Sequence, residues 1–245
     1  MSVAGQRVLV TGASSGLGRA VSERLAHGGA TVLATARREA RLLELAKAHP
    51  NVEPHALDLT DGEALGMFCA RLGRLDGAIL NAGVTDAGPF LEGSSEGDHA
   101  MIATNVSANL QLARALHAQL SGGRLVVVGS MAGFVPVPYQ AVYSGTKAFV
   151  QNWALALREE WRDDVSVGLF APGGIRTEMT EAEALRHLDR HLSDVGGVAD
   201  ALIRFYGGKG AMHVPGGGNR VAAALSRLVP APGLARMMER IYRRP

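Results

Sequence analysis

The sequence has 245 residues, a length that suits one large α/β domain or two small ones. Apolar residues make up 47% of it and charged residues 20%, which is the composition of a globular protein with a substantial core. A net charge of +2 is too close to neutral to indicate a nucleic-acid partner, so no such partner is expected.

The N-terminus enters an apolar segment at Arg7–Val10 without the charged and apolar regions of a signal peptide. No stretch reaches the ~18 consecutive apolar residues of a membrane-spanning helix. The only cysteine, Cys69, excludes an intramolecular disulfide and is expected to be buried. These features together predict a cytoplasmic protein.

Short apolar runs rich in β-branched residues alternate with longer amphipathic segments. The predicted strands are Arg7–Val10, Thr31–Ala34, Val52–Leu57, Gly77–Leu80, Arg124–Val128 and Val165–Phe170. The predicted helices are Gly16–His27, Glu39–Ala48, Ala64–Leu72, Asp98–Leu120 and Ala141–Trp161. Strands that are apolar throughout indicate a sheet buried on both faces. We therefore predict an α/β fold, a single domain over residues 1–245 with a doubly wound parallel sheet of about seven strands and helices on both faces.

The regular alternation weakens after Pro172. A polar, helix-like stretch, Thr177–Arg190, and a Gly-rich segment, Tyr206–Asn219, follow. Since ligands bind outside the carboxyl ends of the strands in open α/β sheets, we expect the segment 177–200 to be a substrate lid.

A glycine-rich segment, Thr11–Gly18, joins the first predicted strand to the first predicted helix. Glycines permit a tight turn and let backbone amides approach a pyrophosphate at the positive end of the helix. An ordinary glycine-rich turn is the alternative. The position at the start of a βαβ unit favours dinucleotide binding.

The ribose of a dinucleotide is recognised about 20 residues past the glycines, where NAD-binding enzymes place an Asp or Glu. This sequence has Ala36, Arg37 and Arg38 there. A guanidinium group binds a 2′-phosphate through paired hydrogen bonds, whereas a carboxylate would repel it. We therefore expect NADP(H) as the preferred cofactor, with NAD(H) as the alternative. The two arginines could also be solvated charges at the start of the next helix.

Tyr143 and Lys147 are one helical turn apart in the predicted helix Ala141–Trp161. This spacing puts both on one face, with Cβ atoms about 5–6 Å apart. A nearby ammonium group favours the phenolate, so Lys147 is expected to lower the pKa of Tyr143 from its ordinary value of about 10. Taken alone, the spacing also arises by chance in pairs on a helix surface.

Five motifs together resemble the short-chain dehydrogenase/reductase family over almost the whole chain. They are the Thr11–Gly18 loop, Asp58 in Leu57–Thr60, Asn81–Gly83, the series Asn105, Ser130, Tyr143 and Lys147, and Pro172–Thr177. The resemblance implies a Rossmann fold. With the cofactor pattern above, it implies these cofactor-binding residues: Gly12, Ser14, Ser15, Gly16, Leu17, Gly18, Arg37, Arg38, Asp58, Leu59, Asn81, Ala82, Gly83, Tyr143, Lys147, Pro172, Gly173, Ile175 and Thr177.

By the same resemblance, Asn105, Ser130, Tyr143 and Lys147 form a catalytic tetrad. Tyr143 would donate a proton to a substrate carbonyl oxygen while NADPH delivers a hydride to the carbon, and Ser130 would hydrogen-bond that oxygen. Lys147 would also hold the nicotinamide ribose, and Asn105 would keep a water in a proton relay through Lys147. The reverse path oxidises an alcohol. Reduction is favoured, because cells generally keep the NADP(H) pool reduced.

Two positions depart from the family pattern. Leu80 stands where many members have an asparagine before Asn81, which we expect to alter packing rather than chemistry. The region Met212–Asn219 lacks the Asp-Gly-Gly ending of tetrameric 3-oxoacyl-carrier-protein reductases, which argues against that substrate and that tetramer.

Substrate and subunit partners are predicted only by class. Specificity is expected to depend on the segment 177–200 and on the loops after Asn81 and Ser130. Apolar side chains in the second loop (Phe134, Val135 and Val137) indicate an apolar pocket and favour apolar ketones. Acyl thioesters, steroids, polyketides and sugars remain open as substrates. The helix after Lys147 commonly packs against a second subunit in this family. Trp153 and Trp161 are therefore expected in the core or at the interface of a homodimer or homotetramer.

The C-terminal region 220–245 is basic and is predicted to form a helical extension. An apolar stripe with helical spacing is formed by Leu234, Met237, Met238 and Ile241. Six arginines and one glutamate accompany it. Such a helix can make a weak contact with an anionic membrane surface, or it can cap the fold or a subunit interface. His187 and His191 share a helical spacing without nearby carboxylates or cysteines, so no metal site is expected.

The sequence therefore predicts an NADP(H)-dependent oxidoreductase that reduces a ketone to a secondary alcohol or catalyses the reverse. An NAD-linked alcohol dehydrogenase is the alternative within the family. A non-catalytic NADP(H)-binding regulator is the alternative outside enzymes, and the complete set of Ser130, Tyr143 and Lys147 argues against it.

Overall fold

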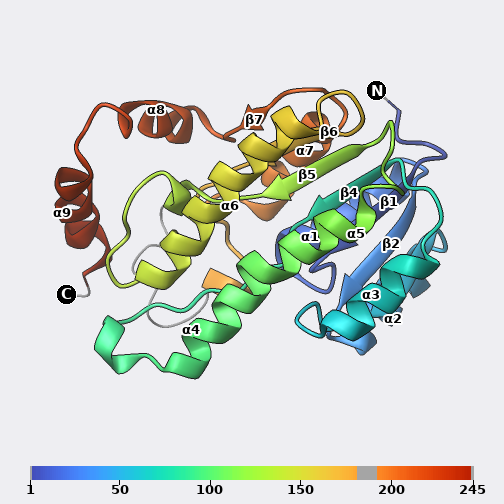
Figure 1. Cartoon of the computed structure of the whole chain (residues 1–245), viewed down its shortest axis with the longest axis horizontal. Helices are drawn as coiled ribbons and strands as arrows, with labels where there is room; N and C mark the ends of the chain where they lie inside the picture. Colours follow the sequence, from blue (N-terminus) through green and yellow to red (C-terminus); the bar gives the residue numbers. More distant parts are fainter. Residues whose placement is uncertain (1, 181–191, 244–245) are drawn as a thin grey trace.

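The computed structural model of the chain describes residues 2–180 and 192–243. Seven strands form one parallel sheet in the order β3-β2-β1-β4-β5-β6-β7, with helices on both faces (Figure 1). The strands are β1 (Arg7–Thr11), β2 (Thr31–Ala36), β3 (Val52–Ala56), β4 (Gly77–Leu80), β5 (Arg124–Val128), β6 (Ser166–Phe170) and β7 (Met212–His213). The predicted α/β fold with a doubly wound parallel sheet is confirmed.

The helices follow the predicted alternation. They are α1 (Gly16–His27), α2 (Glu39–Ala48), α3 (Gly62–Arg71), α4 (Ser95–Ile102), α5 (Ala108–Leu116), α6 (Ala141–Glu160), α7 (Val195–Tyr206), α8 (Gly217–Leu225) and α9 (Ala231–Tyr242), with single 3-10 turns η1 (Phe90–Glu92), η3 (Met131–Gly133) and η4 (Glu178–Thr180). α1 and α2 have the predicted bounds. α3 starts at Gly62 rather than at Ala64, because the Asp61 carboxylate caps it by accepting hydrogen bonds from the backbone N–H groups of Glu63 and Ala64.

The long helix predicted over Asp98–Leu120 is divided in the structure. Ser94 caps α4, accepting a hydrogen bond from the Gly97 N–H at 3.0 Å. A π-helical turn, η2 (Ala103–Ser107), then joins α4 to α5. Such turns are rare and occur mostly at functional sites, and this one contains Asn105.

The two faces of the sheet have separate apolar cores, because successive residues of a strand point to opposite faces. Val8 and Val10 of β1 pack with α1, α2 and α7 on one face. Leu9 packs with α3, α5 and α6 on the other, where Cys69 is buried as predicted. Because all the strands are parallel, their carboxyl ends lie along the same edge of the sheet.

The chain after β6 is only partly described. η4 and the start of α7 are seen, whereas residues 181–191 lie outside the described residues. The helix predicted over 177–190, the lid predicted over 177–200, and His187 and His191 fall wholly or partly there, so these predictions stay untested. Within residues 2–180 and 192–243, no group of three His, Cys, Asp or Glu side chains could hold a metal ion.

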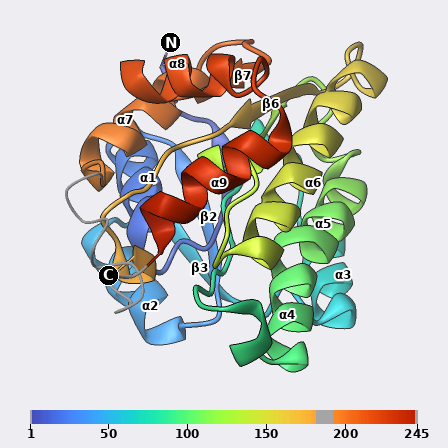
Figure 2. The ribbon, with the colours of Figure 1, turned by 90° about the vertical axis from the view of Figure 1, so that its left-hand side faces the viewer.

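The C-terminal extension 220–245 contains most of α8 and all of α9, and α9 runs across the face of the molecule that Figure 2 shows. Leu234 of α9 is buried, but Met237 and Ile241 are 52% and 44% exposed. The predicted apolar stripe is therefore only partly covered by the rest of the chain. Among the described helices, none is both long and apolar enough to cross a membrane.

The packing of β6 against α7 and β7 gives a test of the core. Phe170 is fully buried and contacts the rings of Phe205 and His213, so Phe170→Ala should lower the free energy of unfolding by about 3–5 kcal/mol. Phe90 is 66% exposed, and Phe90→Ala should change that free energy by less than about 0.5 kcal/mol. Urea unfolding followed by circular dichroism measures both. Equal losses in the two variants would contradict this packing.

Candidate functional site

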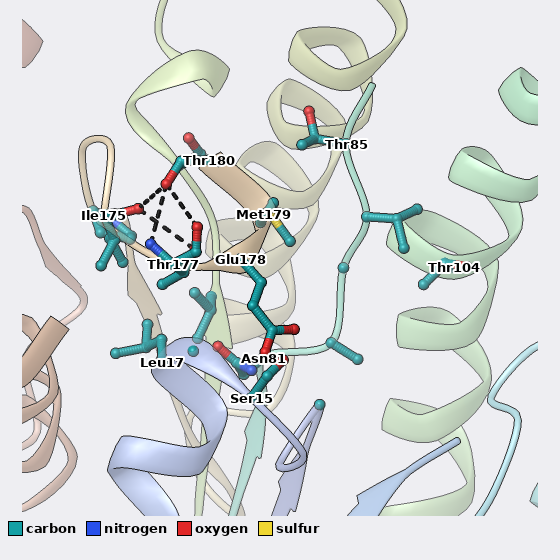
Figure 3. A pocket seen from close by; sticks show the side chains of 18 of the residues that line it. Ser15, Leu17, Asn81, Thr85, Thr104, Ile175, Thr177, Glu178, Met179 and Thr180 are labelled. Carbon is teal, nitrogen blue, oxygen red and sulfur yellow. Dashed lines mark hydrogen bonds between the residues drawn. The ribbon is translucent and has the colours of Figure 1, made fainter. Parts of the chain in front are cut away.

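A cleft of about 720 Å³ lies at the carboxyl edge of the sheet (Figure 3). Its lining contains most of the predicted site residues: Gly12, Ser14, Ser15, Gly16, Leu17, Arg37, Arg38, Asp58, Leu59, Asn81, Ala82, Gly83, Ser130, Tyr143, Lys147, Pro172, Gly173, Ile175 and Thr177. Gly18 and Asn105 are absent from that lining. They support it from behind.

The loop between β1 and α1 lies directly against the residues that follow β4. Gly12 has a φ of +70°, and a Cβ there would lie 2.9 Å from Nδ2 of Asn81. A Cβ on Gly18 would lie 2.2 Å from the carbonyl oxygen of Gly12, so the loop requires glycine at both positions. The Thr11 hydroxyl fixes this contact by accepting hydrogen bonds from the N–H groups of Asn81 and Ala82, both at 3.0 Å.

Arg38 joins the glycine loop to a residue that was not predicted. Its Nε donates to the Ser14 hydroxyl at 3.2 Å, and its Nη2 donates to the Ser15 hydroxyl. Its Nη1 donates to the Glu178 carboxylate at 2.8 Å, and Arg41 binds the other oxygen of that carboxylate. Two guanidinium groups and two serine hydroxyls thus gather at this end of the cleft.

Arg37 and Asp58 line the cleft near this cluster, as predicted. The Asp58 carboxylate accepts hydrogen bonds from the N–H and hydroxyl of Thr60 at 2.9 and 2.8 Å. These bonds hold the pKa of Asp58 below its ordinary value, and the charge of Arg37 acts in the same direction. The Arg37 side chain itself is exposed.

Tyr143, Lys147 and Ser130 meet where β5 ends and α6 begins. The Ser130 side chain is close enough to Tyr143 to lower the pKa of that phenol. Nζ of Lys147 lies 5.8 Å from the centre of the Tyr143 ring and donates to the carbonyl oxygen of Val128 at 3.2 Å. The structure therefore brings together three of the four predicted catalytic side chains in one wall of the cleft.

Burial controls the ionisation of this pair. Lys147 is only 6% exposed, and burial lowers its pKa to about 8. Burial also raises the pKa of Tyr143, and the neighbouring Ser130 side chain partly offsets that rise. The sequence predicted a lowered pKa for Tyr143, and this direction is wrong, because removing the phenolate from water has the largest effect on that pKa.

Asn105 is fully buried behind the pair. Its Oδ1 accepts a hydrogen bond from the Val84 N–H at 2.8 Å, and its Nδ2 donates to the Val84 carbonyl oxygen at 2.9 Å and to the Thr146 hydroxyl at 3.1 Å. A Cβ on Gly83 would lie 3.2 Å from Oδ1 of Asn105 and 3.5 Å from Nζ of Lys147. Asn105 thus fixes the loop after β4 against α6, immediately beside Lys147.

The segment after β6 closes over the glycine loop. The Thr180 hydroxyl donates to the Ile175 carbonyl oxygen at 2.8 Å and accepts from the Thr177 N–H at 3.1 Å, which forms a compact turn (Figure 3). A Cβ on Gly16 would lie 3.1 Å from Cγ2 of Thr177. This turn places Glu178, the next residue, within reach of Arg38.

The prediction that Phe134, Val135 and Val137 form an apolar pocket is wrong, because none of the three lines the cleft. Phe134 packs beside a small core of Ala171, Val214 and Ala223, and Val137 is buried. The apolar lining includes Met131 and Ala132 from the predicted loop after Ser130, and Met179 and Leu192 from the predicted segment 177–200. It also includes Tyr242, which sequence reasoning missed.

Tyr242 is contributed by the last turn of α9 and is close enough to Tyr143 to affect its pKa. Leu234, Met238 and Tyr242 follow one another at intervals of four residues, so they share the inner face of α9. That spacing extends the apolar stripe seen in the sequence, but it could not show that the face covers a cleft.

The chain has the features that a dinucleotide requires. The glycine loop leaves no room for side chains at Gly12 and Gly18, and α1 begins at Gly16 with its N-terminal end in the cleft. The cluster around Arg38 already binds an anionic group, the Glu178 carboxylate. These two observations fit a pyrophosphate beside α1 and a further phosphate near Arg38.

The relatives found by comparison with known proteins include dehydrogenases and reductases. The chain is 31% identical over 218 residues to L-xylulose reductase of Bos taurus, a match that covers 83% of this chain and 89% of that protein. It is 30% identical over 218 residues to 11-beta-hydroxysteroid dehydrogenase A of Sesamum indicum, covering 82% of this chain but 63% of that longer protein. A solved short-chain dehydrogenase from Sphingobium yanoikuyae, in complex with NADPH, has a TM-score of 0.83 and 29% identity, covering 91% of this chain and 92% of that one.

The sequence profile of the short chain dehydrogenases matches residues 6–187. This range runs from β1 past β6 and contains all five motifs that the sequence presented. The chain therefore belongs to the short-chain dehydrogenase family of oxidoreductases.

Proposed function

We propose that this protein is an NADP(H)-dependent reductase that converts a ketone to a secondary alcohol, or catalyses the reverse. The observation that carries the proposal is the position of Tyr143, which lies beside the Ser130 side chain and one helical turn from the buried Lys147, whose Nζ is 5.8 Å from the Tyr143 ring. These side chains line the same cleft as the glycine loop and Arg38.

The glycine loop, Ile175 and Thr177 line the cleft where a nicotinamide cofactor would be held, and that cofactor would supply the hydride for the carbonyl carbon. Tyr143 donates its hydroxyl proton to the carbonyl oxygen, and its raised pKa keeps that proton in place at neutral pH. The Ser130 hydroxyl hydrogen-bonds the same oxygen as negative charge develops. Lys147, with a pKa of about 8, is mostly protonated at pH 7, so its charge stabilises the phenolate that Tyr143 becomes.

Asn105 is proposed to support this proton transfer indirectly. Its side chain holds the loop after β4 beside Lys147 through hydrogen bonds with Val84 and Thr146. A water kept near Asn105 would pass protons between Lys147 and solvent, which is the role that the family resemblance implies.

The preference for NADP(H) rests on the arginines after β2. Arg38 binds the Glu178 carboxylate and also donates to the hydroxyls of Ser14 and Ser15. Arg37 is exposed and lines the same cleft. A charge-assisted hydrogen bond of this kind contributes about 1.5–3 kcal/mol to binding. The structural relative in complex with NADPH supports the same choice. One observation favours NAD(H), namely that the negative charge of Glu178 opposes a second anion in this cluster.

The substrate is proposed to be an apolar carbonyl compound. Met131, Met179 and Tyr242 add apolar surface to the cleft that holds Tyr143. Gln140 offers a polar contact on the same wall, and its Nε2 donates to the Thr85 hydroxyl at 2.9 Å. The two curated relatives are named for different substrates, a hydroxysteroid and L-xylulose, so their names do not favour one substrate class. The apolar lining of the cleft is what favours an apolar ketone.

We also propose that the enzyme is cytoplasmic, that it forms a homo-oligomer and that it makes a weak membrane contact. The last two proposals rest on exposed apolar residues. Phe149 of α6 is 43% exposed, which fits a homodimer or homotetramer formed through this helix. Leu228 and Met237 are 79% and 52% exposed beside the arginines of the extension 220–245, which fits a weak contact with an anionic membrane surface. Because Tyr242 lines the cleft, a test of membrane binding should replace Met237 rather than remove α9.

Removing the proposed acid tests the reaction directly. Tyr143→Phe should lower kcat by about 100-fold or more, because general acid catalysis contributes about 10²–10⁴ to the rate. NADPH binding should persist. The loss of NADPH absorbance with a panel of ketones measures turnover, and fluorescence titration measures binding. Tyr206→Phe is the matched control, since Tyr206 donates to Gln6 far from the cleft. Full activity of Tyr143→Phe would refute the assignment.

The buried lysine should lower the stability of the folded protein. Its pKa falls from 10.5 to about 8 on folding, so below pH 8 the charged group costs free energy, and between pH 8 and 10.5 stability rises as the folded state loses the proton first. Lys147→Met should therefore raise the free energy of unfolding at pH 7 by about 1–3 kcal/mol, allowing for the lost hydrogen bond. It should also abolish turnover.

Urea unfolding at pH 7 measures this change, with Lys209→Met as control because Lys209 is exposed. The control should leave stability within about 0.5 kcal/mol of the original protein. A clear loss of stability in Lys147→Met would show that burial of the ammonium group carries no cost.

A further inference from the structure

Glu178 forms a bridge across the end of the cleft. Its two carboxylate oxygens bind different guanidinium groups: Nη1 of Arg38 donates to Oε2 at 2.8 Å, and Nη1 of Arg41 donates to Oε1. Glu178 stands on η4, after β6, whereas the two arginines follow β2. The bridge therefore joins two segments that are 140 residues apart in the sequence.

The bridge is built on the residues proposed to recognise the cofactor. Arg38 also donates to the hydroxyls of Ser14 and Ser15 in the glycine loop. Figure 3 shows the Glu178 side chain pointing from η4 towards Ser15. Ser14, Ser15, Arg38 and Glu178 all line the cleft, so the carboxylate occupies a place where a ligand phosphate would meet the same donors.

A carboxylate and a phosphate compete for guanidinium groups because both accept paired, charge-assisted hydrogen bonds. The hydrogen bonds from Arg38 and Arg41 hold the pKa of Glu178 below its ordinary value, so the carboxylate is ionised at neutral pH. A phosphate that arrives must either displace this charge or lie beside it, and both reduce its binding.

We propose that Glu178 is a cofactor-discriminating residue, an internal anion that competes with the 2′-phosphate of NADP(H) for Arg38 and so narrows the preference for NADP(H) over NAD(H). The inference rests on the proposed binding of NADP(H) in this cleft. It assigns Arg41, which the sequence did not single out, as a second arginine that becomes available to the phosphate when Glu178 is released.

Nucleotide fragments test the inference without turnover. Adenosine 2′,5′-bisphosphate and 5′-AMP differ only in the 2′-phosphate, and calorimetric titration gives the affinity for each. Glu178→Gln keeps the size of the side chain and removes its charge. It should bind the bisphosphate roughly three- to tenfold more tightly than the original protein, with unchanged affinity for 5′-AMP. The gain should shrink as salt rises from about 0.05 M to about 0.5 M.

Glu39→Gln is the matched control. Glu39 follows Arg38 directly and carries the same charge, but within the described residues it makes no ion pair. It should change neither affinity by more than about twofold. A gain in Glu39→Gln as large as in Glu178→Gln would overturn the inference, since the general charge of the region would then explain the effect.

Two other results would overturn the inference in distinguishable ways. If Glu178→Gln gains no affinity for the bisphosphate while the original protein still prefers it to 5′-AMP, Glu178 does not compete and the proposed NADP(H) preference stands. If the original protein and Glu178→Gln both bind the two fragments equally, the cluster does not recognise a 2′-phosphate, and the proposed cofactor preference fails together with the inference.

Discussion

The burial of the Lys147 ammonium group is the constraint on which the proposed chemistry depends. Nζ donates to the Val128 carbonyl oxygen and lies beside the Tyr143 ring, with little access to water. Burial disfavours the charged form of both groups, which keeps the tyrosine protonated and brings the lysine pKa close to physiological pH. At pH 7 this wall of the cleft therefore offers a protonated Tyr143 and a charged Lys147, the proton donor and the cation that the proposed carbonyl reduction requires.

The part of the cleft around Arg38 has a different electrostatic character. There the arginines are exposed, and their positive charge is shared among two serine hydroxyls and Glu178. The sheet brings these two parts into one cleft because its parallel strands all end at the same edge. Thr11 holds that edge together, since its hydroxyl binds the backbone that follows β4.

Local patterns in the sequence predicted much of this arrangement. The bounds of α1 and α2 and the place of the glycine loop follow from apolar periodicity and turn residues within about one βαβ unit. The motifs of the family then indicated Ser130, Tyr143 and Lys147, which the structure brings together.

The features that sequence reasoning missed depend on contacts between distant segments. Glu178 reaches Arg38 across 140 residues, and Tyr242 reaches the cleft from the far end of the chain. No periodic pattern within either segment records such a contact. The predicted lowering of the Tyr143 pKa was wrong for a related reason. The spacing between Tyr143 and Lys147 can be read locally in the sequence, whereas the burial that raises the pKa is set by the whole fold.

The pH dependence of kcat/KM for ketone reduction tests the central role of the buried pair most directly, because this parameter reports the ionisation of the free enzyme. We expect kcat/KM to be constant up to neutral pH and to fall tenfold for each further pH unit well above about 8, because Lys147 loses its proton while Tyr143 keeps its own. A kcat/KM that stays constant to about pH 10, the range expected for an unperturbed lysine, would contradict the proposed role of the buried Lys147 ammonium group.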